Sequence, residues 1–285
     1  MKYVEFFQQF SNPVFDWFFR IITEFGDQYF FIILGAILYW TIDKKFAFKF
    51  MITFLASAFI NGGLKELANT TRPYQNGAKP ILGLKTTGSS MPSGHAQSIG
   101  VMGIVMTDKF KHVNWVKYGF YALMVLVPIS RVYLGQHYLH DVIVGLSLGI
   151  FFGILFMFLL SYKKDDVEDI RALYLVPILV LLLFLVYNKD LYVASFAYMG
   201  LTLGYFIEKR YVKNDIKGPL KHQIIKVAIG LIGALLIKEG LKPLFALFSD
   251  EFFFDGVRYF LVALWASLGV MFIAKKYIPK ITLEK

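Results

Sequence analysis

The chain has 285 residues, of which 57% are hydrophobic, and it contains no cysteine. A soluble domain carries roughly 45–50% apolar residues, so this composition disfavours an ordinary soluble fold, and the missing cysteines exclude disulfides, thiolate chemistry and cysteine metal sites. The net charge of +10 would suit nucleic-acid binding, but the chain lacks the basic and aromatic surface motifs of that class, so we assign the charge to anchoring at a membrane.

Residues 1–28 mix aromatic side chains such as Phe6 and Trp17 with polar ones such as Gln9 and Asp16. This mixture is too polar for an easy membrane span. We expect an amphipathic helix that lies in the membrane interface, and a tenth, tightly packed span is the alternative.

Nine apolar segments follow. We expect each to cross a hydrocarbon layer as a helix of about 20 residues, the shorter segments by borrowing flanking residues. The predicted fold is therefore an all-α polytopic membrane bundle. It divides into the interfacial segment 1–28, a membrane core at 29–162 and a C-terminal transmembrane extension at 163–285. The expected spans are 29–42, 46–63, 96–108, 117–134, 141–161, 172–187, 191–207, 224–242 and 257–274.

Lysine and arginine are distributed unevenly between the two sets of loops that join these spans. One set, together with the C-terminal tail, holds most of them, and loops rich in basic residues stay in the cytoplasm. The segment 64–95 and the corner 131–140 are then expected outside the cytoplasm. The N-terminus is expected on that outer side, and the C-terminus on the cytoplasmic side.

The first segment whose side chains could take part in a reaction runs from Lys65 to Pro73, at an expected membrane boundary. Lys65 and Arg72 are seven positions apart, which is two turns of a helix, so on a helix both cations face one pocket. The alternative is that both side chains simply reach for lipid headgroups.

The second segment is Pro92-Ser93-Gly94-His95, directly before an apolar helix. Ser93 suits the N-cap position, and Gly94 lets a ligand approach the backbone closely. The free N–H groups of a helix start bind phosphate, and His95 is placed to donate a proton there. The alternative is an ordinary helix start that His95 caps.

The third segment runs from Ser130 to Asp141 and contains Arg131 and His137. His137 and Asp141 are four positions apart, so they share one face of a helix. A carboxylate that holds one ring nitrogen fixes the histidine tautomer and leaves the other nitrogen free to attack. The alternative is an Asp–His pair that only caps the helix.

Taken together, the three segments bring cations, histidines, a carboxylate and a helix start to one expected membrane face. Ionisable residues at such depth are candidates for function. The set meets the needs of phosphoryl transfer, namely charge stabilisation, a nucleophile and an acid for the leaving oxygen. His140 lies outside this pattern and is expected to be structural, whereas His112 and His222 are expected to be solvated in cytoplasmic loops.

These segments resemble the three signature motifs of the type 2 phosphatidic acid phosphatase superfamily, Lys-x6-Arg-Pro, Pro-Ser-Gly-His and Ser-Arg-x5-His-x3-Asp, without departure at any motif position. The resemblance covers roughly residues 25–160 and implies a phosphatase core of six-helix type. It implies that His137 forms a phosphohistidine, that Asp141 orients it, and that His95 protonates the leaving oxygen. The implied phosphate ligands are Lys65, Arg72, Ser93, the N–H of Gly94, and Arg131.

The family is metal-free, so the resemblance implies no metal and no other cofactor. The sequence agrees, because it offers no carboxylate cluster of the kind that Mg²⁺ uses. The expected partners are a lipid phosphate and the bilayer, and nucleic acid is not expected.

The expected activity is hydrolysis of a lipid phosphomonoester or diphosphate at the extracytoplasmic face of a bacterial cell membrane. Undecaprenyl pyrophosphate, phosphatidylglycerophosphate and phosphatidic acid are the candidate substrates. Two alternatives stay open: a phosphotransferase that uses the same histidine, and a non-enzymatic lipid transporter or scaffold. A haloperoxidase is disfavoured because a vanadate enzyme of that type has no need of nine spans.

The resemblance does not extend over the spans after residue 172. There Lys238, Glu239 and Lys242 lie near the outer end of the eighth expected span, and Arg258 begins the ninth. One hypothesis is that these charges contact the substrate headgroup or a partner subunit. The alternative is an ion pair that closes the helix ends.

Overall fold

The computed structural model describes residues 1–162, 166–185, 187–247 and 251–278, and every regular element in these ranges is helical. The chain forms two compact units. Unit 1 comprises Met1–Ile32 and Ser57–Phe158, and unit 2 comprises Ile33–Ala56 and Leu159–Lys285. Each unit is described separately below.

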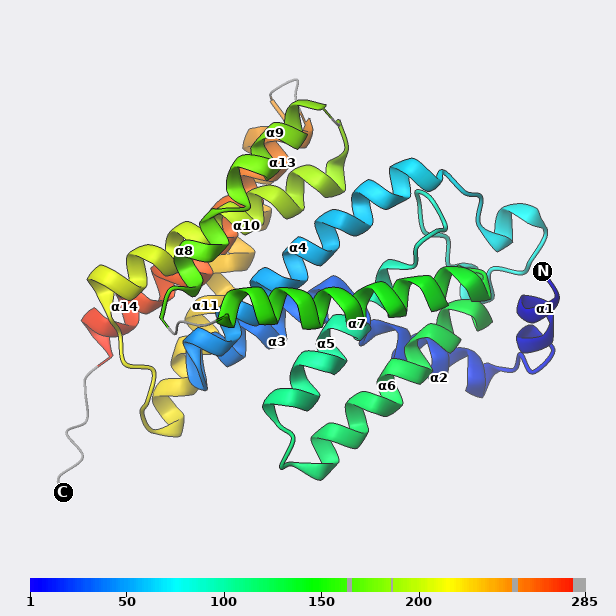
Figure 1. The fold of residues 1–285 in the computed structure, drawn as a ribbon, viewed down its shortest axis with the longest axis horizontal. Coiled ribbons are helices and arrows are strands. Elements are labelled where there is room, and N and C mark those ends of the chain that lie inside the picture. The colour runs from blue at the N-terminus through cyan, green and yellow to red at the C-terminus, as the bar shows by residue number, and fades with distance from the viewer. Residues whose placement is uncertain (163–165, 186, 248–250, 279–285) are drawn as a thin grey trace. The chain divides into compact units, whose positions relative to one another are not determined.

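Unit 1 contains two N-terminal helices, three longer helices and a loop region with two 3₁₀ turns (Figure 1). Two further helices, α3 (Gln28–Thr41) and α4 (Lys44–Ala68), run from one unit into the other along the chain. The elements of unit 1 are α1 (Lys2–Gln8), α2 (Pro13–Glu24), η1 (Pro73–Asn76), η2 (Ile81–Gly83), α5 (Gly94–Lys109), α6 (Asn114–Tyr133) and, as far as Phe158, α7 (Leu139–Ser161).

Unit 2 is built from the C-terminal helices, and its chain is interrupted by two π-helical turns. Its elements are α8 (Glu168–Leu173), α9 (Val176–Leu185), α10 (Lys189–Ile207), η3 (Glu208–Val212), α11 (Leu220–Gly240), α12 (Lys242–Phe245), α13 (Glu251–Leu264), η4 (Trp265–Gly269) and α14 (Val270–Tyr277).

The described residues contain fewer clear spans than the sequence predicts. Three segments are long and apolar enough to cross a membrane, Lys44–Asn76, Leu139–Ser161 and Phe252–Tyr277, and the pair α2–α3, bent by 48°, is a fourth if it acts as one span. The other expected spans fall on helices that are shorter or more polar. For example, α5 has 16 residues and α9 has 10, below the usual 17–25. The all-helical membrane fold is confirmed, and the nine spans are not.

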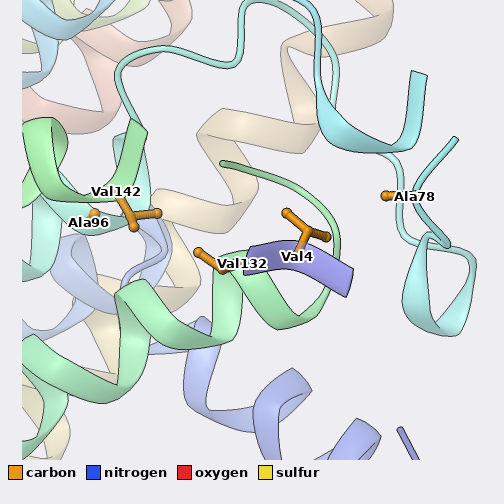
Figure 2. Close-up of a cluster of buried hydrophobic side chains, with 5 residues drawn as sticks. All are labelled: Val4, Ala78, Ala96, Val132 and Val142. Carbon is orange, nitrogen blue, oxygen red and sulfur yellow. The ribbon is translucent and has the colours of Figure 1, made fainter. Parts of the chain in front are cut away.

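The N-terminal segment forms two helices rather than the single expected one. Asn12 caps α2 by accepting hydrogen bonds from the N–H groups of Val14 and Phe15, and α2 exposes an apolar face that includes Trp17. Val4 of α1 is buried in the core of unit 1. Figure 2 shows its four partners in that cluster, Ala78, Ala96, Val132 and Val142.

Helix α5 lies directly on α7 because α7 presents glycines at the contact. A Cβ atom at Gly145 would come within 2.5 Å of the Ser93 carbonyl oxygen, and one at Gly149 within 2.2 Å of that of Gln97. Small residues at such positions let two helix backbones meet. The close approach brings the start of α5 to the start of α7, where the Ser93 N–H donates to the Asp141 carbonyl at 3.1 Å.

Candidate active site

The start of α5 forms one wall of the site. Ser93 is the N-cap of this helix, as predicted, and its buried hydroxyl accepts from the Ala96 N–H at 3.5 Å. A buried amide network ties this turn to α4: the Gln97 side chain donates to the Ser57 carbonyl at 2.8 Å and accepts from Asn61 at 2.7 Å. The free N–H groups of the first turn are therefore held in a fixed direction.

His137 and Asp141 meet at the start of α7, with their side chains 2% and 0% exposed. The His137 Nδ1 atom lies 3.7 Å from Asp141 Oδ2. The expectation that both residues lie on one helix is wrong in detail, because α7 begins at Leu139. His137 belongs to the preceding turn, which still brings its ring to the carboxylate.

The other ring nitrogen of His137 faces a cation. Arg72 Nη1 lies 3.2 Å from His137 Nε2, and a guanidinium can only donate. Nε2 is then the acceptor, which leaves the ring proton on Nδ1 toward Asp141. Such a tautomer presents a lone pair to the pocket, as a nucleophile requires.

Two partners hold the Asp141 carboxylate in place. Its Oδ2 atom accepts from the Ser90 hydroxyl at 2.6 Å and from the Tyr138 N–H at 2.9 Å. The Ser90 hydroxyl also lies 3.5 Å from His137 Nδ1. Ser90 was missed in the sequence, although it stands two positions before Pro92 of the second motif.

Lys65 and Arg72 converge, but not along one helix as predicted. Helix α4 ends at Ala68, and Arg72 is extended with φ −88° and ψ 157°, the conformation that a following proline favours. A returning loop joins the two cations, because Lys65 Nζ and Arg72 Nη2 each donate to the Ser89 carbonyl at 3.1 Å.

Arg72 is 2% exposed, and backbone carbonyls hold it on several sides. Besides Ser89, it donates to the carbonyls of Gly88, Thr87 and Gln136 at 3.0–3.1 Å. Carbonyls orient a guanidinium without neutralising it. The charge therefore stays available to an anion.

Arg131, on α6, is 3% exposed and donates from Nη1 to the Thr23 hydroxyl at 3.0 Å. Its buried Nε has no hydrogen-bond partner among the residues that the structure describes. An unpaired buried donor is costly, and an anion in the pocket would satisfy it.

The N-terminal helices contribute to the site in a way that the sequence did not reveal. Thr23 of α2 holds Arg131, and Asp27, between α2 and α3, places Oδ2 3.9 Å from His95 Nε2. The only sequence signal was the polarity of the segment 1–28, which the interfacial prediction attributed to headgroups.

His140 contacts the same carboxylate from outside. Its side chain is 65% exposed, with Nε2 3.2 Å from Asp141 Oδ1, and its ring stacks on Tyr138. Within the described ranges, no group of three or more histidine or acidic side chains is arranged to hold a metal ion.

Both site histidines have depressed pKa values. Burial is the main cause for His95, whose pKa lies well below its usual value, and Arg131 adds to the effect. Burial also lowers the pKa of His137, to about 3; the adjacent Asp141 carboxylate opposes this shift, and the neighbouring cations reinforce it. At neutral pH both rings are therefore neutral until an anion enters.

These shifts predict how stability depends on pH. In the unfolded chain these histidines take up protons near pH 6.5. In the folded chain they take up protons only at lower pH. Stability should therefore fall as pH drops below about 6.5. We expect the melting temperature of the detergent-solubilised protein to fall less between pH 7.5 and pH 5 in His137→Asn and in His95→Asn than in the wild type.

The exposed His112 provides the matched control for this measurement. His112→Asn should keep the wild-type dependence of melting temperature on pH. Identical slopes for wild type, His95→Asn and His137→Asn would contradict the assignment of neutral histidines to the folded site.

The charges singled out in the C-terminal extension form local pairs. Arg258 pairs with Asp255 at 2.5 Å and donates to the Lys238 carbonyl at 3.2 Å, and Lys238 pairs with Glu239 at 2.9 Å. This arrangement favours the alternative in which ion pairs close the helix ends.

Sequence comparisons give two adjacent matches. Residues 46–165 match the PAP2 superfamily. Residues 192–277 match the transmembrane extension of PAP2 superfamily phosphatases.

Three curated proteins illustrate the relatives of this chain. It is 28% identical over 145 residues to the dolichyldiphosphatase of Saccharomyces cerevisiae, covering 47% of this chain and 61% of that protein. It is 30% identical over 133 residues to the undecaprenyl-diphosphatase of Sulfolobus acidocaldarius, covering 45% and 62%. It is 28% identical over 143 residues to sphingosine-1-phosphate phosphatase 1 of Rattus norvegicus, covering 47% and 32%. The matched region thus spans less than two thirds of each relative.

One solved structure shares the fold. The PAP2-type phosphatidylglycerolphosphate phosphatase of Bacillus subtilis is 24% identical, with a TM-score of 0.50, and the alignment covers 58% of this chain and 86% of that one. At this identity the likeness concerns the fold alone.

Proposed function

This chain is a membrane protein of the PAP2 superfamily that carries the superfamily's transmembrane extension, and we propose that it hydrolyses a lipid phosphomonoester or diphosphate through a phosphohistidine. The observation that carries the proposal is the orientation of His137. Its Nδ1 atom faces Asp141 and its Nε2 atom faces Arg72 inside a buried cationic pocket. We further propose that the site lies on the extracytoplasmic face of a bacterial cell membrane and that the C-terminus is cytoplasmic; the bias of lysine and arginine between the loops supports this orientation.

In the proposed mechanism the phosphate enters among Lys65, Arg72 and Arg131, at the N–H groups that begin α5. The unpaired Nε–H of Arg131 donates to one phosphate oxygen. Arg72 turns its Nη1–H from His137 to another oxygen. This step frees the Nε2 lone pair while stabilising the charge on the equatorial oxygens.

Bond making and breaking then follow. His137 Nε2 attacks the terminal phosphorus, the bond from that phosphorus to the leaving oxygen breaks, and His95 gives its proton to this oxygen. The leaving oxygen is the lipid oxygen of a phosphomonoester or the bridging oxygen of a diphosphate. A water molecule next attacks the phosphohistidine and loses a proton to His95, and inorganic phosphate leaves with Nε2 restored. Asp141 stabilises the positive charge that His137 carries in the intermediate.

His95 needs a proton to act as the acid, and the bound substrate makes this protonation favourable. In the empty site burial and the nearby cations keep its pKa well below the usual value. A phosphate dianion beside the ring favours the charged form and raises that pKa. Protonation of the acid is therefore coupled to substrate binding.

The relatives act, by their names, on both lipid diphosphates and a lipid monophosphate. The test is therefore to measure phosphate release from three lipids: undecaprenyl pyrophosphate, phosphatidylglycerophosphate and phosphatidic acid. The protein is purified in detergent, EDTA is present throughout, and His137→Ala is the control.

Release that survives EDTA and disappears in His137→Ala would support the metal-independent histidine mechanism, and the ranking would identify the substrate class. Absence of release from every lipid by folded protein would overturn hydrolysis. A phosphorylated acceptor with little free phosphate would instead identify a phosphotransferase. Lipid movement across the bilayer of vesicles that contain the protein, without either product, would identify a transporter.

Ser90 is predicted to be a positioning residue for this reaction. Its hydrogen bond to Asp141 is 2.6 Å long, and losing it should cost about 1–1.5 kcal/mol of the interaction that orients the carboxylate. Ser90→Ala should therefore lower kcat about tenfold with little change in KM. Ser90→Thr, which keeps the hydroxyl, should recover most of the rate. Steady-state kinetics on the preferred lipid measures both.

The matched control is Ser195→Ala, since Ser195 is an equally buried serine in unit 2. This variant should keep the wild-type kcat. A wild-type kcat in Ser90→Ala, or an equal loss in Ser195→Ala, would remove the positioning role.

A further inference from the structure

Unit 2 contains an apolar groove of about 950 Å³ that the proposed reaction does not use. This volume is at the upper end of the range for small-molecule sites, about 300–1,000 Å³. Its walls include Ile237, Leu261, Leu264, Trp265, Leu268 and Phe272.

The groove is polarised along its length. Near its first end, Arg258 of α13 donates to the Lys238 carbonyl of α11, which brings Ile237 and Leu261 together. At its other end, Lys275 of α14 donates to the Val212 carbonyl at 2.5 Å. The segment from Leu261 to Lys276 spans about 22 Å of helix. The groove is therefore long and apolar, and the charged residues of its lining, Lys275 and Lys276, lie at this second end.

Two π-helical turns line this one groove. Tyr211 and Val212 come from η3, and Trp265, Leu268 and Gly269 come from η4. η3 ends α10, whereas η4 joins α13 to α14, and single π turns inside longer helices, such as η4, recur at functional sites. The Trp265 indole donates to the Gly230 carbonyl at 3.1 Å, which holds the ring in the wall.

The cationic end has no acidic partner in the part of the chain that the structure describes. Lys275 contacts a carbonyl, and Lys276 lies 5.1 Å from the centre of the Tyr277 ring. The phenol of Tyr211, which is 73% exposed, lies at the same end. Both lysines are exposed, so an occupant that brings negative charge here and an apolar chain to the rest of the groove would complement both parts.

From this complementarity we propose that the groove binds a phospholipid with an anionic headgroup. Its acyl chain lies against Leu264, Leu268 and Phe272, and its phosphate lies between Lys275 and Lys276. The groove runs along Phe252–Tyr277, a segment long and apolar enough to span a membrane, so a lipid reaches it from the bilayer. Basic pockets between membrane helices bind anionic headgroups in this way. A lipid without net charge, or the apolar helix of a second copy, would add no net negative charge beside the two lysines.

Trp265 provides a local probe for the test. The full chain is placed in phosphatidylcholine nanodiscs that contain a small fraction of brominated lipid, either brominated phosphatidylglycerol or brominated phosphatidylcholine. Bromine quenches indole fluorescence on contact. The quenching of Trp265 itself is the quenching measured in the wild type minus that measured in Trp265→Phe.

We expect several-fold more quenching of Trp265 by brominated phosphatidylglycerol than by brominated phosphatidylcholine. Lys275→Gln with Lys276→Gln should reduce the phosphatidylglycerol signal to the phosphatidylcholine level. The matched control, Lys217→Gln with Lys221→Gln, removes two exposed lysines of the same unit and should leave the difference intact.

Equal quenching by the two lipids, or a difference that survives the groove substitutions, would overturn the proposal. Absence of quenching by either lipid, together with Trp265 cross-links between two copies, would identify a second copy as the occupant and would also overturn it. The readout does not depend on catalysis, so its outcome is separate from that of the proposed phosphatase activity.

Discussion

Replacing His137 with alanine is expected to lower kcat for lipid phosphate hydrolysis by at least about 10⁴-fold, the order seen when a catalytic nucleophile is removed. The reason is that the Nε2 lone pair that faces Arg72 would be the only acceptor for the phosphoryl group. Phosphate release and acid-quenched trapping of a labelled, acid-labile phosphoenzyme measure the effect. The trapped label should disappear in the variant.

The exposed His112 again gives the control, since His112→Ala should keep both the rate and the trapped label. A phosphoenzyme that persists in His137→Ala would assign the nucleophile to another residue. A wild-type rate without any trapped label would point to direct attack by water, with His137 as a base.

Replacing His95 with alanine is expected to have an effect that depends on the leaving group. A general acid contributes about 10²–10⁴-fold when the leaving group is a lipid alkoxide, as in phosphatidic acid. A lipid monophosphate that leaves from a diphosphate is far less basic and needs less protonation. The loss in kcat should therefore be largest for phosphatidic acid, smaller for undecaprenyl pyrophosphate and smallest for p-nitrophenyl phosphate.

Kinetics of His95→Ala on these three substrates measures the ranking. A uniform loss on all three would show that His95 binds the phosphate and does not protonate the leaving oxygen. Asp27→Asn is a useful companion, because Asp27 lies 3.9 Å from the His95 ring. If the carboxylate favours protonation of His95 once the substrate is bound, this variant should reproduce the leaving-group dependence with a smaller amplitude.

The sequence by itself determined the helical membrane class and identified the residues that meet in the pocket. Long apolar runs can only satisfy their backbone groups in lipid as helices or closed barrels, and their length favoured helices. The spacing from His137 to Asp141 also predicted their contact, because four residues bring two side chains together in a helix and nearly so in the turn before one.

Other features depended on tertiary structure. Lys65 and Arg72 share a pocket because the Ser89 carbonyl, from a distant loop, accepts from both, and no local spacing specifies that loop. Ser90, Thr23 and Asp27 belong to the site because of packing between segments far apart in sequence.

The local sequence pattern also did not determine the number of spans or the environment of residues 1–28. Apolar composition reports only a preference for burial, and both lipid and protein core satisfy it. Val4 is buried by protein, at 1% exposed, while Trp17 on the next helix remains 60% exposed. Which environment each side chain meets is decided by the neighbours that folding brings to it, as the glycine contact between α5 and α7 decides where the second and third motifs meet.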